Sequence, residues 1–244
     1  MNSNSLYANS QEPGRKLRVL ALHSFRTSSK IFQAQFIRAK LGLATEDLVE
    51  VVYIDAPHPA SGLIPRDVEH FFKGPYYEWF TVETMGDKLQ FDEDKLAAST
   101  HYISKALKEK GPFDGIVAFS QGACLASSLV AMQSHGVVMQ DIPRLKFCIL
   151  FGGFKSRHPV HKAFMATKIK VPSLHVIGDR DDIKEDCLEL ADAFESSITL
   201  SHPKGHVIPA FNAQHTAILR AFLATFLQPS LEDTSVTETI ASKL

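Results

Sequence analysis

The feature that most constrains the fold of this chain is an alternation between short apolar runs and amphipathic helical segments. Six apolar runs recur along the sequence, at residues 17–22, 48–54, 115–119, 147–151, 173–177 and 197–201. Near-continuous apolar runs are typical of strands that are buried on both faces of a parallel sheet. Helical periodicity lies between most of them, at residues 92–110, 122–132, 184–195 and 212–227. The alternation predicts an α/β fold, with a mostly parallel sheet of about six strands and helices on both faces.

The composition is that of one soluble domain with a substantial core. The chain has 244 residues, of which 45% are hydrophobic and 22% charged, and its net charge is −1. We expect the domain to span residues 15–228, between a disordered N-terminus at 1–14 and a flexible tail at 229–244. The near-neutral charge gives no case for nucleic-acid binding, and we expect no signal peptide and no membrane span.

The three cysteines predict neither a metal site nor a disulfide framework. Cys124 and Cys148 fall in apolar segments, and Cys187 falls on the apolar face of a predicted helix. None of them has the spacing of metal ligands. We therefore expect buried, reduced thiols, which fit an intracellular protein.

Ser120 occupies the position in which a nucleophilic serine is expected. It follows the apolar run at 115–119 and precedes the small-residue segment at 122–132. A strand, a sharp turn carrying a serine and a helix are the context of a nucleophile elbow, and the helix dipole there favours a developing anion. The usual motif has glycine two residues earlier, where this chain has Ala118. Serines before Gln-Gly also occur in ordinary turns, so the motif alone leaves both interpretations open.

Asp181 and His206 complete the order Ser…Asp…His, which is that of α/β-hydrolases. Each follows an apolar run, and open α/β sheets place their sites at the carboxyl ends of strands. Asp179, Asp181 and Asp182 crowd one turn, and any of them could cap the following helix. Asp182 therefore stays as the alternative acid. We expect no metal, because no histidine or further acid is suitably spaced, and no cofactor.

Residues 57–91 interrupt the alternation of strands and helices. They contain four prolines and a cluster of aromatic residues. A loop of this length inside a compact domain is usually functional. Tyr76, Tyr77, Trp79 and Phe80 are candidates for the wall of an apolar substrate pocket. The alternative is that these aromatic side chains only pack the loop onto the body of the domain.

Several motifs together resemble the FSH family of serine hydrolases, which includes small eukaryotic esterases and fungal polyketide thioesterases. The resemblance covers about residues 16–227 and rests on LHSFRTS at 22–28, DAP at 55–57, PYYEWF at 75–80, GPFDG at 111–115, FSQG at 119–122 and HPKGHVIP at 202–209. The PYYEWF block is most similar to the plant branch. The family commonly has glycine where this chain has Ser24 and Ala118, and neither change removes a catalytic group.

The resemblance implies an α/β-hydrolase fold and carries the family's catalytic triad onto Ser120, Asp181 and His206. The serine would attack an acyl carbonyl, the histidine would take and return its proton, and the aspartate would orient the imidazole. The backbone N–H groups of Phe25 and Gln121 would form the oxyanion hole. We expect the neighbouring histidine at position 23 to shape that loop through hydrogen bonds, without acting as a base.

The expected activity is cleavage of a small-molecule carboxylic ester or thioester, and the attack chemistry does not separate the two. The alternative is a non-catalytic binding or receptor protein with an α/β-hydrolase fold, since fold does not fix function. A dinucleotide-binding oxidoreductase is disfavoured, because no Gly-x-Gly-x-x-Gly turn follows the first apolar run.

The sequence finishes with Ser242, Lys243 and Leu244, a tripeptide that peroxisomal import receptors read. The polar residues before it would present it to such a receptor. We therefore expect the import receptor as a partner and the peroxisome as the location, and otherwise the cytoplasm. A peroxisomal location would favour a CoA-linked or lipid-derived acyl group.

Overall fold

A six-stranded parallel sheet forms the centre of the computed structural model, which describes residues 15–227. Its strands are β1 (Leu17–Leu22), β2 (Val49–Ile54), β7 (Gly115–Phe119), β8 (Phe147–Phe151), β9 (Ser173–Gly178) and β10 (Ser197–His202). They lie in the order β10-β9-β8-β7-β1-β2, and every neighbouring pair is parallel. These are the six predicted apolar runs, each within one residue at either end, so the predicted fold class is confirmed.

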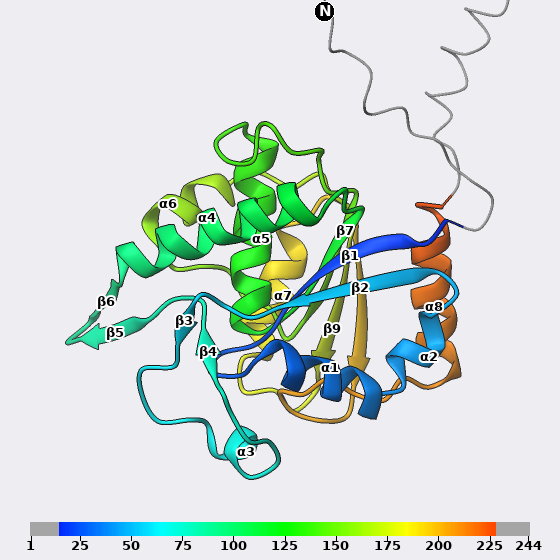
Figure 1. Cartoon of the computed structure of the whole chain (residues 1–244), viewed down its shortest axis with the longest axis horizontal. Coiled ribbons are helices and arrows are strands. Elements are labelled where there is room, and N and C mark those ends of the chain that lie inside the picture. The colour runs from blue at the N-terminus through cyan, green and yellow to red at the C-terminus, as the bar shows by residue number, and fades with distance from the viewer. Residues whose placement is uncertain (1–14, 228–244) are drawn as a thin grey trace, which may run out of the picture.

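Helices cover both faces of this sheet (Figure 1). One face carries α4 (Glu93–Lys110), α5 (Gln121–Ser134), α6 (Pro159–Phe164) and α7 (Lys184–Asp192). The other carries α1 (Ser29–Arg38), α2 (Leu41–Thr45) and α8 (Ala213–Ala224). Alternate residues of β7 face opposite sides, because successive side chains of a strand do so. Ile116 and Ala118 therefore join the first core, and Val117 and Phe119 join the second.

Side-chain caps fix where three of these helices begin. Asp92 accepts a hydrogen bond from the N–H of Lys95 at the start of α4, and Asn212 accepts one from His215 at the start of α8. Both capping residues are the first residues of predicted helices. Ser28 caps α1 in the same way, and the sequence analysis named no helix there. Such caps satisfy N–H groups that have no partner inside the helix.

Residues 57–91 contain short elements in place of the expected long loop. The two-residue strands β3 (His58–Pro59) and β4 (Tyr77–Glu78) pair, and α3 (Arg66–Glu69) lies between them. The antiparallel hairpin of β5 (Val82–Met85) and β6 (Lys88–Phe91) extends away from the sheet (Figure 1). Hydrogen bonds join Trp79 and Phe80 of this segment to His23, which follows β1, and to Gln121, near the end of β7, so the segment lies beside the site described below.

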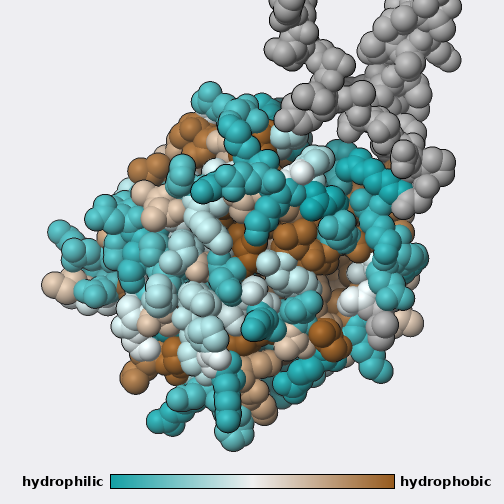
Figure 2. Space-filling model, in the orientation of Figure 1, coloured by the Kyte–Doolittle hydropathy of each residue, from teal (hydrophilic) through white to brown (hydrophobic). Residues whose placement is uncertain are grey.

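The face seen in Figure 2 is mainly hydrophilic, with hydrophobic side chains in separate patches. Within residues 15–227, no helix combines the length and the apolar character that crossing a membrane requires. The expected disordered N-terminus at 1–14 and the tail at 229–244, which includes Ser242, Lys243 and Leu244, lie outside the described residues.

Candidate active site

Ser120 lies in a strained turn between β7 and α5. Its backbone has φ 53° and ψ −114°, an arrangement that costs a non-glycine residue about 1–3 kcal/mol and clusters at functional sites. The turn also brings α5 close to β1. A Cβ atom at Gly122 would lie 2.5 Å from the carbonyl oxygen of His23 and 2.6 Å from that of Leu22, so only glycine fits. Ala118 is fully buried and is accommodated where the motif commonly has glycine.

A continuous chain of hydrogen bonds joins Ser120, His206 and Asp181. The Nε2 atom of His206 lies 2.8 Å from Oγ of Ser120, and its Nδ1 lies 2.7 Å from Oδ2 of Asp181. The carboxylate accepts a hydrogen bond, so Nδ1 carries the proton and Nε2 is free to accept the hydroxyl proton of the serine. The other carboxylate oxygen accepts the N–H of Ile183 at 3.0 Å, which fixes the orientation of this acid.

The geometry distinguishes the three acids of the turn after β9. The side chain of Asp181 is 2% exposed and contacts His206. Asp179 instead pairs with Lys184 at 3.3 Å. Asp182 is exposed, and no hydrogen bond joins it to His206 within the described part of the chain. The structure thus brings Asp181, and not the alternative Asp182, to the histidine.

Packing holds the imidazole of His206 in place. The ring of Phe119, the last residue of β7, lies 5.0 Å from the imidazole, centroid to centroid. On another side is Gly152, which has φ 49° and follows β8. A Cβ atom there would lie 2.8 Å from Cε1 of His206, so a larger residue would displace the ring. No motif in the sequence pointed to Gly152.

The loop after β1 contains Phe25, whose backbone N–H is expected to stabilise an oxyanion together with that of Gln121. His23 is fully buried, and burial lowers its pKa to about 4, so the ring is neutral at pH 7. Its Nε2 accepts the N–H of Ala56 at 2.9 Å, and its Nδ1–H donates to the carbonyl oxygen of Ser24 at 2.8 Å. Within the described residues, the N–H groups of Phe25 and Gln121 have no hydrogen-bond partner. Both are therefore available to a ligand.

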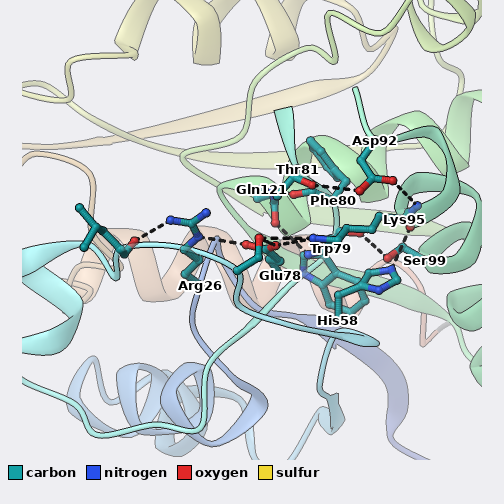
Figure 3. A network of polar contacts seen from close by, with 12 residues as sticks. Arg26, His58, Glu78, Trp79, Phe80, Thr81, Asp92, Lys95, Ser99 and Gln121 are labelled. Carbon is teal, nitrogen blue, oxygen red and sulfur yellow. Dashed lines mark hydrogen bonds and ion pairs between the residues drawn. The ribbon is translucent and has the colours of Figure 1, made fainter. Parts of the chain in front are cut away.

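Trp79 and Phe80 connect this loop to the serine turn, and Figure 3 shows them beside Gln121. The side chain of Gln121 accepts the N–H of Trp79 at 3.0 Å and donates to the carbonyl oxygen of Phe80 at 2.8 Å. The indole N–H of Trp79 donates to the carbonyl oxygen of His23 at 2.8 Å. This segment thus bonds to the loop that contains Phe25 and to the side chain of Gln121. Sequence spacing gave no sign of these contacts.

Glu78 ties the same segment to two further elements (Figure 3). Its carboxylate is fully buried and lies 3.0 Å from Nε of Arg26 and 2.9 Å from Nζ of Lys95. The hydroxyl of Ser61 also donates to it, at 2.6 Å. Burial raises the pKa of this carboxyl, but the three hydrogen bonds outweigh it, so the pKa is lowered and the group is ionised. Arg26 directly follows Phe25, so the network also anchors the loop after β1.

A cavity of about 620 Å³ opens at Ser120. Its hydrophobic lining comes from four parts of the chain, and consists of Phe25, Phe80, Val82, Leu89, Phe91, Phe154 and Ile183. Among the four predicted substrate contacts, Phe80 lines this cavity, and Tyr76, Tyr77 and Trp79 do not. Trp79 is fully buried, and the hydroxyl of Tyr76 donates to the carbonyl oxygen of Phe72 at 2.7 Å. For these three residues the structure shows packing contacts and not a cavity wall.

The cysteines and acids of the described residues form no metal centre. Within residues 15–227, no group of three or more His, Cys, Asp or Glu side chains could hold a metal ion. Cys124, Cys148 and Cys187 are free and buried. Cys124 borders the cavity, and burial raises its pKa to about 12, so it is a neutral thiol rather than a nucleophile.

A parallel sheet with a serine in the turn after a central strand defines the class of α/β-hydrolases. The chain belongs to the serine hydrolase family FSH1, whose family model matches residues 11–218, and it is accordingly a hydrolase. Human esterase OVCA2 is 34% identical over 230 residues, which cover 88% of this chain and 98% of that protein. Bovine esterase OVCA2 is 32% identical over 229 residues, or 86% of this chain and 96% of that protein.

Two further proteins are similar to this chain. Rhodanese-like domain-containing protein 6 of Arabidopsis thaliana is 31% identical over 244 residues, covering 90% of this chain. The matched part is 41% of that longer protein. The solved structure of Zea mays acyl-protein thioesterase 2 superposes with a TM-score of 0.60 at 18% identity, covering 89% of this chain and 96% of the other. This last similarity shows the fold alone.

Proposed function

We propose that this hydrolase cleaves a carboxylic ester or thioester through an acyl-enzyme on Ser120. The observation that carries the proposal is the chain of hydrogen bonds from Asp181 through His206 to Ser120. It lies at the carboxyl ends of the parallel strands, beside the N–H groups of Phe25 and Gln121, which have no partner within residues 15–227. Membership of a serine hydrolase family and the similarity to proteins named esterases support it.

In the first half of the reaction, Oγ of Ser120 bonds to the acyl carbon while Nε2 of His206 accepts the hydroxyl proton. The carbonyl oxygen becomes an oxyanion, which the N–H groups of Phe25 and Gln121 stabilise. Removing one such donor typically costs about 3–4 kcal/mol of transition-state stabilisation. The C–O or C–S bond then breaks, and His206 gives its proton to the departing alkoxide or thiolate. Asp181 stabilises the imidazolium in between.

The second half repeats these steps with water. His206 takes a proton from the water, whose oxygen attacks the acyl carbon, and the same N–H groups receive the new oxyanion. The bond to Oγ of Ser120 breaks, and the imidazolium returns a proton to that oxygen. The products are a carboxylic acid and an alcohol or thiol, and no group beyond water is consumed. The apolar cavity beside Phe80 would hold the acyl part.

Ester hydrolysis by matched serine variants tests this proposal. Wild type should hydrolyse 4-nitrophenyl butyrate, and Ser120→Ala should lose at least about a thousandfold in kcat. Ser134→Ala is the control, because Ser134 lies at the far end of α5 and donates to the carbonyl oxygen of Val130. It should keep full activity. A non-catalytic binding protein would instead give equal and negligible rates for wild type and Ser120→Ala.

Peroxisomal targeting is a separate proposal that rests on Ser242, Lys243 and Leu244, outside the described residues. An N-terminal fluorescent fusion should enter peroxisomes, and deletion of the tripeptide should leave it in the cytosol. The deletion should not alter hydrolysis, because Ser120, Asp181 and His206 all precede it. An intact fusion that is diffuse in the cytosol would exclude this role of the tripeptide.

A further inference from the structure

A second cavity, of about 530 Å³, also opens at Ser120. It shares Phe25, Ser120 and His206 with the first cavity, so the hydroxyl of the serine lies where the two meet. An ester bound at this serine extends in two directions from its carbonyl carbon, one toward the acyl chain and one toward the leaving group. The two cavities therefore offer separate places for the two parts of a substrate.

The second cavity lies on the side of the histidine loop. Lys204, Val207 and Ile208, which flank His206 in that loop, line it. The first cavity is instead lined by Gln121 and Cys124 of the serine turn and helix. Protonated His206 must deliver its proton to the leaving group, and His206 lines both cavities. The charges of the two linings therefore decide which cavity suits the leaving group.

The two cavities differ in the charges that they offer a ligand. The cations of the first, Arg26 and Arg157, are already paired with Glu78 and Asp186. Asp181, Asp182 and Asp186 also line the first cavity, so an anion is disfavoured there.

The second cavity is lined by two cations, Arg38 and Lys204, and by one acid, Asp67. Neither cation forms an ion pair within the described residues, and the guanidinium of Arg38 lies over the ring of Phe71, 5.7 Å from its centroid. Two cations without a carboxylate partner are available to an anion on a ligand.

Gln35 of α1 also lines this cavity. Its Oε1 atom is buried and has no hydrogen-bond partner among residues 15–227, so the cavity wall contains an unsatisfied acceptor. The charge that suits a leaving group in this cavity is set by Arg38 and Lys204, and it is negative.

We propose that the second cavity binds a leaving group that bears a phosphate, so that the substrates of this hydrolase are phosphate-bearing thioesters or oxyesters. Arg38 and Lys204 are then the residues that determine this specificity. The inference rests on the proposed ester hydrolysis at Ser120 and adds the class of leaving group. A phosphate occurs both in the thiol part of a coenzyme A thioester and in the alcohol part of an acyl glycerol phosphate.

Paired substrates with the same acyl group test the proposal. The thioester pair is butyryl-coenzyme A and butyryl-N-acetylcysteamine, which shares the thioester and lacks the phosphates. The oxyester pair is a monobutyryl glycerol phosphate and monobutyrylglycerol. We expect kcat/KM to be higher for the phosphate-bearing member of at least one pair, and the pair that responds identifies the source of the phosphate. The preference should shrink with rising ionic strength, because salt screens exposed charges.

Charge-removing variants assign the preference to the cavity. Arg38→Gln and Lys204→Gln should each lower kcat/KM for the phosphate-bearing substrate by about fivefold, and the double variant by more than about tenfold. The ratio of kcat/KM between the phosphate-bearing substrate and its neutral partner should fall accordingly, which separates loss of the phosphate contact from a general loss of activity. Lys30→Gln is the matched control, because Lys30 is an exposed cation of α1 outside the cavity and its loss should not change the preference.

Different experimental results would overturn the leaving-group proposal and the proposed hydrolysis at Ser120. If the neutral substrates are hydrolysed as well as the phosphate-bearing ones in both pairs, or if the double variant leaves the preference unchanged, the leaving-group proposal is overturned and hydrolysis at Ser120 stands. If no ester or thioester is hydrolysed, or if Ser120→Ala hydrolyses them at the wild-type rate, the proposed function fails and this inference fails with it.

Discussion

The indole N–H of Trp79 donates a hydrogen bond to the carbonyl oxygen of His23, which lies 56 residues earlier in the sequence. His23 begins the loop that contains Phe25. The side chain of Gln121 accepts the N–H of Trp79 and donates to the carbonyl oxygen of Phe80. A fully buried tryptophan therefore bonds to the loop that contains Phe25 and to the side chain of Gln121, and we expect the N–H groups of these two residues to stabilise an oxyanion. Preorganised donors are effective because they need no rearrangement during the reaction.

Replacing this indole tests whether the connection matters for catalysis. Trp79→Phe keeps a buried aromatic ring but removes the donor to His23. We expect kcat for ester hydrolysis to fall by about tenfold with little change in KM, because the oxyanion forms only after substrate binding. Tyr76→Phe is the control, since it removes a hydrogen bond of the same segment to Phe72. Equal effects of both variants on kcat would show a purely structural role.

The two neighbouring acids give a direct comparison of roles. Asp181→Asn should lower kcat by about 10⁴-fold, because the amide favours the wrong tautomer of His206. Asp182→Asn should change kcat by less than about twofold, because this exposed side chain makes no hydrogen bond to the imidazole within residues 15–227. Circular dichroism and melting temperature should be alike for both variants. A large loss of kcat in Asp182→Asn alone would reverse the assignment.

Removing the buried negative charge of Glu78 should destabilise the fold. Glu78→Gln leaves Arg26 and Lys95 without their common carboxylate. Breaking a fully buried pair costs about 3–5 kcal/mol, but both cations are partly exposed, so we expect a loss of about 2 kcal/mol in the free energy of unfolding. Urea denaturation measures it, with the exposed Glu83→Gln as control. Equal stability of the two variants would mean that the network contributes nothing to folding.

Because two histidines are buried, we expect the free energy of unfolding to fall at acidic pH. Burial lowers the pKa of His23 and of His175 to about 4, from 6.5 in an unfolded chain. Between these values the unfolded state binds more protons than the native state, so the free energy of unfolding falls as pH falls. Each of the two histidines should lower the free energy of unfolding by about 2 kcal/mol between pH 7 and pH 5.

Urea denaturation at pH 7 and pH 5 measures this loss in wild type and in His175→Gln. The variant should lose about 2 kcal/mol less than wild type on acidification, because it has one buried histidine fewer. His101→Gln is the control, since His101 is exposed on α4, and it should lose as much as wild type. Identical pH dependence in His175→Gln and wild type would contradict the expected effect of burial.

The strands of the sheet could be predicted because their signal is local. Both faces of β7 and β8 are buried, so nearly every residue in them is apolar, and the sequence marks their ends within one residue. The hairpin of β5 and β6 escaped prediction for the opposite reason. The four residues of β5 are all exposed, and no hydrophobic alternation distinguishes them from a loop.

The site was predictable where its residues follow strand ends, as Ser120, Asp181 and His206 do, and the structure brings these three together. The role of Trp79 was not predictable, because its burial depends on contacts with Gln121 and His23, which lie 42 and 56 residues away in the sequence. An aromatic side chain in a pocket wall and one that braces a loop look alike in sequence. Only the fold separates Phe80, which lines the cavity, from Trp79.

The central claim is that Ser120 becomes covalently modified during turnover. Treatment with a fluorophosphonate, followed by intact-mass analysis and peptide mapping, measures this directly. We expect one adduct per chain, on the peptide that contains Ser120, together with loss of esterase activity in proportion to labelling. Ser120→Ala should take up no label. An adduct on another serine, such as Ser156 in the same cavity, or full hydrolysis by an enzyme labelled at Ser120, would contradict it.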